Sequence, residues 1–228
     1  MKKIVAVLCP MPMEFEAVEK ALGRLGEPLD YGFEEKRFAL DNCDLILARC
    51  GVGKTFAAAK TQKIVMTYAP EHLFVCGVAG AVSRELKVFD IVVPDKVVHG
   101  DVCFGAHWCP TDVVDSAKPL FEGNPAFRDD GFRPDRLDAP FNRGTLATLD
   151  RFAEEPDKDF LEEKFNAVCI DMESASVMQI ATMNEVPVTI IRAISDNREH
   201  SFGDFETNAP KACDAAARAL TALLEKLD

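Results

Sequence analysis

The sequence predicts a single α/β domain built on a mixed β-sheet. Apolar runs of strand length alternate with segments whose apolar residues recur every three or four positions. Some runs, such as residues 4–9, are apolar at every position, which is typical of strands buried on both faces. The chain has 228 residues, 48% of them hydrophobic, and no linker or repeat divides the sequence. We therefore expect residues 1–228 to form one domain.

The first half of the chain is expected to contain four strands and two helices. The first helix places Phe15, Val18 and Leu22 on one face, and Gly23 helps to end it. The predicted strands cover residues 4–9, 36–40, 44–50 and 72–80, and the predicted helices cover residues 15–25 and 52–67.

The second half continues the alternation after a segment that the pattern does not assign. Residues 103–140 are rich in Pro, Gly and Asp and show no clear periodicity. A long apolar stripe predicts a last helix over residues 212–227, with Asn208 before Pro210 as its N-cap. The other elements are strands at residues 89–102 (interrupted by Pro94), 144–150, 166–172 and 186–195, and a helix at residues 173–183.

Composition excludes several classes of protein. The formal charge is −12 and the acidic residues are spread along the chain, so no basic face is expected for nucleic acid or an anionic membrane. No apolar run approaches the length of a membrane span. Pro10 and Pro12 follow the first apolar run without a cleavage site, so this run is interpreted as a strand and not as a signal peptide. The eight scattered cysteines are expected to be reduced, as in a cytoplasmic protein.

Residues 48–55, ARCGVGKT, come close to a nucleotide phosphate-binding loop. That loop needs a glycine at its first position, where this chain has Ala48. Without that glycine the backbone cannot easily wrap its amides around a triphosphate. Two interpretations remain: a tight turn from strand to helix that uses the freedom of glycine, or a turn that also forms one wall of a pocket at the carboxyl ends of the strands.

Three acidic residues follow predicted strands at their carboxyl ends. Glu14 lies just after the first strand, Glu173 after the strand at residues 166–172, and Asp196 after the last strand. Each one alone could be a helix-start acid or a solvated charge. Because ligands bind where strands end in α/β sheets, the three together indicate a functional site.

These stretches together resemble the nucleoside phosphorylase/nucleosidase superfamily, and most closely its methylthioadenosine/S-adenosylhomocysteine nucleosidases. Five motifs occur in the family's order over most of the chain, and the glycine turn described above is one of them. They are residues 11–14 (MPME), 51–62 (GVGKTFAAAKTQ), 77–95 (GVAGAVSRELKVFDIVVPD), 171–176 (DMESAS) and 192–196 (RAISD).

The resemblance implies a three-layer α/β/α sandwich of the phosphorylase/hydrolase-like type, a homodimer, and hydrolysis of the bond between a purine and ribose. A nucleoside is then the small-molecule substrate, and no cofactor is needed. Asp196 would protonate the base. Glu173 would bind the ribose hydroxyls and favour a cationic sugar. Glu14 would activate the attacking water, as one carboxylate does in inverting glycosidases.

The resemblance also implies substrate-binding roles for residues near these acids. Arg192 would support Glu14 or the water, Met172 would pack against the ribose, and Phe152 would stack on the base unless it belongs to the core. Phe202, with Phe104 and Trp108, could line an apolar pocket for the 5′ substituent, or could be ordinary packing. The remaining substrate-binding positions that it implies are Ser195 and Val78.

Departures from the family's pattern leave alternatives open. The family's usual first glutamate is Asp171 here, and a hydroxyl that helps to hold the water is absent at Val78. Hydrolysis of futalosine or adenosine, phosphorolysis, and a non-catalytic nucleoside-binding module are the other interpretations. An acid at position 14, with no arginine after the first strand, favours water over phosphate as the nucleophile.

A metal site is not expected. Four residues that can bind zinc occur close together, but their spacing matches no standard zinc motif. They are His99, Cys103, His107 and Cys109.

Overall fold

A computed structural model of the chain describes residues 2–31, 34–104, 107–108, 141–198 and 202–227. Ten of its strands form one mixed sheet with the order β2-β3-β4-β1-β5-β11-β10-β7, and β12 and β6 join it beside β5. These strands are β1 (Lys3–Cys9), β2 (Glu27–Tyr31), β3 (Glu35–Ala39), β4 (Cys43–Arg49), β5 (His72–Ala81), β6 (Ile91–Val92), β7 (Lys96–His99), β10 (Thr145–Thr148), β11 (Ala167–Asp171) and β12 (Val188–Asp196). A separate small hairpin consists of β8 (Cys103–Phe104) and β9 (His107–Trp108).

Strand β5 is the centre of the sheet. It pairs in parallel with β1 and β12 and antiparallel with β11. β1 also pairs in parallel with β4, whereas β3 pairs antiparallel with β4 on the other side. The predicted mixed sheet is therefore confirmed. Because β1, β5 and β12 run in the same direction, their carboxyl ends meet at one edge of the sheet.

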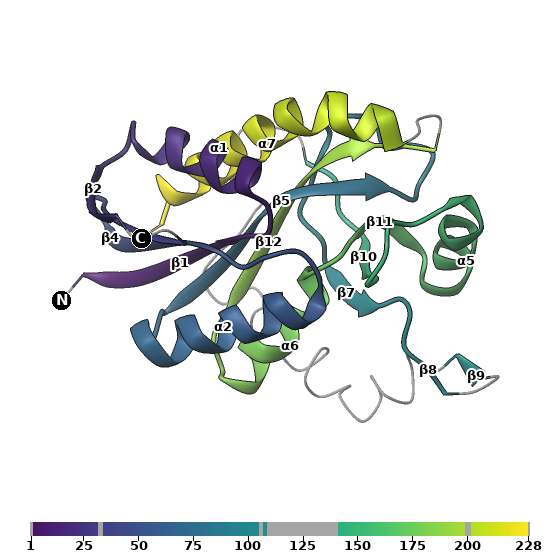
Figure 1. Cartoon of the computed structure of the whole chain (residues 1–228), viewed down its shortest axis with the longest axis horizontal. Helices are drawn as coiled ribbons and strands as arrows, with labels where there is room; N and C mark the ends of the chain where they lie inside the picture. Colours follow the sequence, from purple (N-terminus) through teal and green to yellow (C-terminus); the bar gives the residue numbers. More distant parts are fainter. Residues whose placement is uncertain (1, 32–33, 105–106, 109–140, 199–201, 228) are drawn as a thin grey trace.

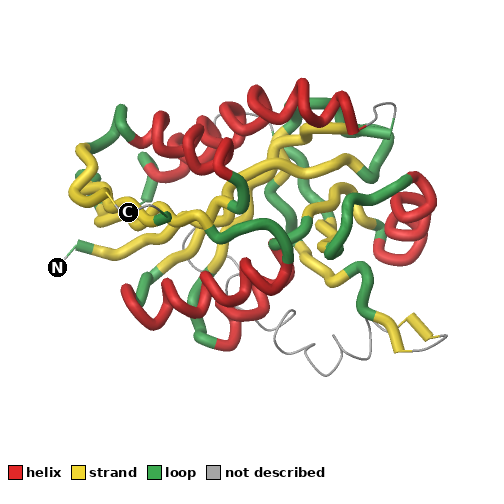
Figure 2. The backbone as a smooth tube through the Cα atoms, viewed as in Figure 1, coloured by secondary structure: helices red, strands yellow, loops and turns green. Residues whose placement is uncertain are grey.

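Helices cover both faces of the sheet and complete the three-layer sandwich (Figure 1; Figure 2). One face packs against α1 (Pro12–Leu22) and α7 (Phe202–Leu224), and the other packs against α2 (Lys54–Tyr68) and α6 (Ser174–Met183). A third apolar cluster joins α5 (Glu155–Phe165) to β10 and β11. In Figure 1, α5 lies beyond the carboxyl ends of the central strands, away from the other helices.

Most expected elements are present, with some differences. The sequence pattern did not predict β2, α5 or the hairpin of β8 and β9. The last helix begins at Phe202 rather than after Asn208, so Asn208 lies inside it and the predicted N-cap is wrong. Pro210 lies within this helix and is exposed. A proline at the helix surface leaves the freed carbonyl open to water, which makes it tolerable there.

The turn at residues 51–53 has the conformation that only glycine adopts easily. Gly51 and Gly53 have φ angles of 86° and 96°. The Gly53 N–H donates to the side chain of Glu173 at 2.9 Å, so the turn also reaches the candidate site. This finding favours the second interpretation of that turn, as a pocket wall. In the described part of the chain, no helix is both long and apolar enough to cross a membrane, and the six cysteines whose side chains are described are free and buried.

Candidate active site

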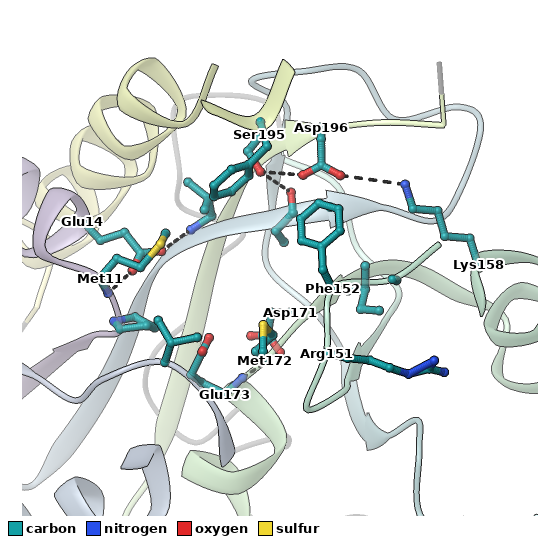
Figure 3. Close-up of a pocket in the computed structure, with 18 residues that line it drawn as sticks. Met11, Glu14, Arg151, Phe152, Lys158, Asp171, Met172, Glu173, Ser195 and Asp196 are labelled. Carbon is teal, nitrogen blue, oxygen red and sulfur yellow. Dashed lines mark hydrogen bonds and ion pairs between the residues drawn. The ribbon is translucent and has the colours of Figure 1, made fainter. Parts of the chain in front are cut away.

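An open cavity with about 600 Å³ of empty space lies at the edge of the sheet where β1, β5 and β12 end. Its walls come from the segments that follow β1, β4 and β10 and from the carboxyl-terminal ends of β5, β11 and β12, and Lys158 of α5 and Phe205 of α7 also line it (Figure 3). This is the usual position for a ligand site in an α/β sheet. The three acids that the sequence singled out, Glu14, Glu173 and Asp196, all line it.

The carboxylate of Glu14 is held by two backbone N–H groups. Met11 donates to Oε2 at 2.7 Å, and Val78 donates to Oε1 at 2.8 Å. Gly77 leaves the necessary room, because a Cβ there would lie 2.1 Å from Oε1. Burial raises the pKa of Glu14, although Arg192 and the two backbone N–H groups act in the opposite direction. A fixed carboxylate with a raised pKa is a stronger base than an ordinary carboxylate.

Arg192 is fully buried beneath the cavity and connects the acidic residues. Its Nη2 donates to Asp171 at 2.5 Å and lies 3.4 Å from Oε2 of Glu173. Nη1 lies 3.8 Å from Oε1 of Glu14. Nη1 and Nε make no hydrogen bond to any described residue. The guanidinium therefore has free donor capacity directed toward Glu14, although its strongest contact is with Asp171.

One guanidinium cannot balance the three surrounding carboxylates, so one carboxyl group is expected to keep a proton. Glu173 is the candidate, because burial raises its pKa to about 8. Arg192 acts to lower that pKa, Asp171 and Glu14 act to raise it, and the Gly53 N–H lowers it. The charge on Glu173 should thus be sensitive to what occupies the cavity.

The raised pKa of Glu173 predicts that the ligand-free protein loses stability as pH rises. Between the ordinary value of 4.5 and about 8, the unfolded chain ionises this carboxyl while the folded chain keeps its proton. The free energy of unfolding should therefore fall with a slope of up to about 1.4 kcal/mol per pH unit over that range. In Glu173→Gln this loss should be absent. Chemical denaturation from pH 5 to pH 9 measures it, and the exposed Glu163→Gln should keep the wild-type slope.

Asp196 lies at the other side of the cavity. The Ser195 hydroxyl is 2.9 Å from Oδ1 of Asp196 and 3.3 Å from the Ala79 carbonyl oxygen. It can donate to an ionised Asp196, or donate to Ala79 and accept from a protonated Asp196. Gly80 leaves room for the carboxyl group, because a Cβ there would lie 2.9 Å from Oδ2. The local geometry is compatible with both protonation states.

The other predicted site residues are placed as follows. Met172 and Phe152 line the cavity. The Phe152 side chain is 44% exposed and packs edge-on against Phe205, so the interpretation of Phe152 as a core residue is wrong. Val78 also lines the cavity, and its contribution to Glu14 is its backbone N–H. Phe202 begins α7, but its side chain lies outside the described part of the structure.

Two of the sequence hypotheses fall on residues that the structure describes only in part. The side chains of Phe104 and Trp108, and those of Cys103 and His107, are not described, and Cys109 lies outside the described ranges. Within the described ranges, no group of three or more His, Cys, Asp or Glu side chains could hold a metal ion.

The structure adds two residues that the sequence reasoning did not place in the site. Asp171 was noted only as a departure from a motif, but it accepts hydrogen bonds from Arg192, Thr148 and Ser174. Lys158 was not considered, yet its Nζ lies 3.8 Å from Oδ2 of Asp196 and its side chain is almost fully buried. Lys158 lies four residues after the N-cap of α5, and the sequence pattern did not predict this helix.

The chain is similar to known proteins over most of its length. A family model described as "Phosphorylase superfamily" matches residues 4–225. A 5′-methylthioadenosine/S-adenosylhomocysteine nucleosidase from Bacillus thuringiensis is 30% identical over 84% of this chain and 85% of its own length. An aminodeoxyfutalosine nucleosidase from Helicobacter pylori is 25% identical over 82% of each chain.

The fold also matches solved structures. The crystal structure of a 5′-methylthioadenosine/S-adenosylhomocysteine nucleosidase from Helicobacter pylori, with butyl-thio-DADMe-Immucillin-A, aligns with a TM-score of 0.81. The alignment covers the full length of both chains at 21% identity. At that identity the match establishes the fold alone.

Proposed function

The chain belongs to the phosphorylase superfamily, and we propose that it hydrolyses the N-glycosidic bond of purine nucleosides, with methylthioadenosine and S-adenosylhomocysteine as preferred substrates. The observation that carries this proposal is the placement of Glu14 and Asp196 on different sides of one cavity (Figure 3). One carboxyl group can protonate the leaving base while the other activates water. The names of the related enzymes support adenine as the base.

Asp196 acts on the base. A purine leaves poorly as an anion and well once it carries a proton at N7. The carboxyl of Asp196 delivers this proton as the bond between C1′ and N9 breaks. Phe152, exposed at the cavity wall, offers a ring face on which the purine can stack.

Glu173 and Glu14 act on the sugar and on water. As the bond breaks, the ribosyl group gains positive charge, and a nearby carboxylate lowers the energy of that state, which favours release of the Glu173 proton to solvent when the substrate is bound. Glu173 binds the ribose hydroxyls, with Met172 packed against the sugar. Glu14 takes a proton from the water that attacks C1′, and Arg192, whose Nη1 lies 3.8 Å from Oε1 of Glu14, supports this carboxylate from beneath the cavity.

Water is favoured over phosphate because Glu14 already occupies an anion-binding position. Two backbone N–H groups and Arg192, which a phosphate could otherwise use, are directed at its carboxylate. A phosphate ion would have to approach this carboxylate closely, and the like charges repel each other.

Chromatographic detection of free base tests the proposal. The protein is incubated with methylthioadenosine, S-adenosylhomocysteine, adenosine, inosine, futalosine and aminodeoxyfutalosine, each with and without phosphate. We expect release of adenine from the first two without phosphate. Dependence on phosphate would contradict the role of Glu14, and preferential cleavage of either futalosine compound would reassign the substrate. Tight binding without any release would leave a nucleoside-binding module.

Formate should partly restore activity to a Glu14→Ala variant. With the carboxylate removed, the N–H groups of Met11 and Val78 and the Nη1 of Arg192 remain directed at a space the size of a carboxylate. We expect formate to raise the low rate of this variant at least about tenfold, because a general base contributes on the order of 10²- to 10⁴-fold. Glu14→Gln, whose side chain fills that space, is the control. A folded Glu14→Ala protein that formate does not activate would contradict the assignment of Glu14 as the base.

A homodimer in the cytoplasm is the expected state of the protein. Support for self-association comes from one face of α2, where Phe56 is 68% exposed and Met66 is 78% exposed. Phe56, Ala59, Lys63 and Met66 follow one another at helical spacing, and all four are exposed. A mostly apolar exposed face of this kind fits an interface between two copies. The molar mass in solution measures the oligomeric state.

A further inference from the structure

The cavity contains a buried ammonium group that the reaction described above does not use. Lys158 is 4% exposed, and its Nζ lies 3.8 Å from Oδ2 of Asp196, which is itself 3% exposed. Lysine is almost never buried to this degree without a charged partner. The other ionic contact of Lys158 among the described residues is Glu155, also at 3.8 Å, and half of the Glu155 side chain is exposed. Asp196 is therefore the more effective partner, because solvent screens Glu155.

Contacts at the end of β12 hold α5, the helix that carries Lys158, close to Asp196. Arg198, two residues after Asp196, donates from Nε to the Val82 carbonyl at 2.6 Å and from Nη2 to Glu162 of α5 at 2.7 Å. Its Nη1 contacts two further acids of α5, Glu155 and Asp159. Arg198 thus ties α5 to the segment that carries Asp196, which keeps the Lys158 ammonium next to the carboxyl group.

A bound purine would change the surroundings of this pair. The wall next to Asp196 includes Ala79, Ile170 and Phe205, so a base in the cavity replaces water with apolar contacts. Desolvation disfavours a carboxylate and an ammonium alike, and the two groups avoid this cost if one proton moves between them. The Ser195 hydroxyl can hydrogen-bond to Asp196 before and after that transfer, because Ala79 offers it a second acceptor.

We propose that Lys158 supplies the proton that Asp196 passes to the departing base. The inference rests on the proposed function. In the free protein the pair is an ammonium and a carboxylate. When the purine enters, Lys158 moves within hydrogen-bond distance and its proton passes to Oδ2 of Asp196. As the bond between C1′ and N9 breaks, its electron pair goes to the purine and the proton of Asp196 goes to N7. Asp196 is then ionised and Lys158 is neutral.

The proton balance closes after the products leave. The attacking water has given one proton to Glu14, which releases it to solvent, and Lys158 regains one proton from solvent. Lys158 is a positioning residue in this scheme, because it acts on the base only through Asp196. Among the described residues, Arg198 and Glu155 also carry charges near the pair, and they keep these charges throughout.

The substitutions Lys158→Arg and Lys158→Met distinguish proton donation by Lys158 from the effect of a positive charge alone. Arginine keeps the charge but does not release a proton in proteins, so Asp196 stays ionised. Methionine removes the charge, and the buried Asp196 then takes its proton from solvent. For methylthioadenosine, kcat should fall about 10²-fold or more in Lys158→Arg and about tenfold or less in Lys158→Met, with KM little changed in both. The exposed Lys164→Arg and Lys164→Met are matched controls on the same helix.

Two further measurements exclude a loss caused by misfolding. A nitrophenyl riboside has a leaving group that needs no proton, so Lys158→Arg should cleave it at the wild-type rate. Infrared difference spectra of protein with carbon-13-labelled aspartate report the state of Asp196 directly. A C-nucleoside analogue of adenosine, which cannot be hydrolysed, should produce a protonated carboxyl band in the wild type and in Lys158→Met, and none in Lys158→Arg or Asp196→Asn.

The outcomes decide between the hypotheses. A Lys158→Arg protein as active as Lys158→Met, or a protonated carboxyl band in Lys158→Arg, would overturn the proposal. So would an equal loss on the nitrophenyl riboside, because this points to damage of the site as a whole. The spectra do not depend on turnover. If the wild type released no base but still showed the band, the proposed function would fail while the coupling of Lys158 to Asp196 would stand.

Discussion

Asparagine in place of Asp196 should nearly abolish base release and leave nucleoside binding intact. The substitution keeps the size of the side chain and can keep the contact with Ser195, but an amide cannot give a proton to N7. General acids contribute about 10²- to 10⁴-fold, so we expect a fall in kcat of that size with a change in KM of less than about threefold. Initial rates of adenine release measure kcat, and calorimetric titration with methylthioadenosine measures binding.

The exposed Asp41→Asn is a matched control and should behave as the wild type. An Asp196→Asn protein that keeps more than about a tenth of the wild-type kcat would show that the base leaves without help from this carboxyl group. Loss of binding together with kcat would instead indicate that Asp196 holds the substrate in place. Thermal unfolding of the variant separates both outcomes from a change in stability.

Of the substitutions considered for this protein, Arg192→Met should lower the free energy of unfolding the most. The substitution leaves Asp171, Glu173 and Glu14 buried around an apolar side chain, and breaking a buried ion pair in this way costs about 3–5 kcal/mol. The loss should be smaller at pH 5 than at pH 8, because the unpaired carboxyl groups can take up protons at the lower pH. Denaturant unfolding at the two pH values measures both effects.

Two other variants identify the cause of that loss. Arg24→Met removes an exposed arginine and should change stability by less than about 0.5 kcal/mol. Asp171→Asn combined with Arg192→Met should recover part of the stability, because the pair that makes the closest contact is then neutral. An equal loss at pH 5 and pH 8 would show that the cavity left by the side chain matters more than the charges.

The central strands and the strand-end acids could be predicted from the sequence because burial on both faces leaves a continuous apolar run. The helix α5 could not. Its buried side chains are Lys158 and Leu161, so it has no apolar stripe to detect. Contacts that no local pattern records hold it in place, notably the ion pairs from Arg198. The start of α7 was also predicted wrongly. A proline is typical of the first turn of a helix, but Pro210 lies well inside α7.

The same limit applies to the site. The rule that ligands bind where strands end correctly brought Glu14, Glu173 and Asp196 to one cavity. It gave no information about Lys158, which reaches the cavity from a helix. It also could not predict that Glu14 would be held by the backbone of Met11 and Val78, because every residue type except proline has the same backbone N–H group.

The position of β12 in the sheet has a consequence for how the protein matures. β12 pairs with β5 along almost its whole length, although the two strands are far apart in the chain. Glu14 is made near the start of synthesis and Asp196 near its end, and Arg192 reaches the carboxylate cluster from β12. Until β12 docks, Glu14 and Glu173 therefore lack the countercharge of Arg192, and the cavity lacks the wall that β12 forms. Pairings between such distant segments form slowly, so the nascent chain should acquire activity and full protease resistance together, in one late step.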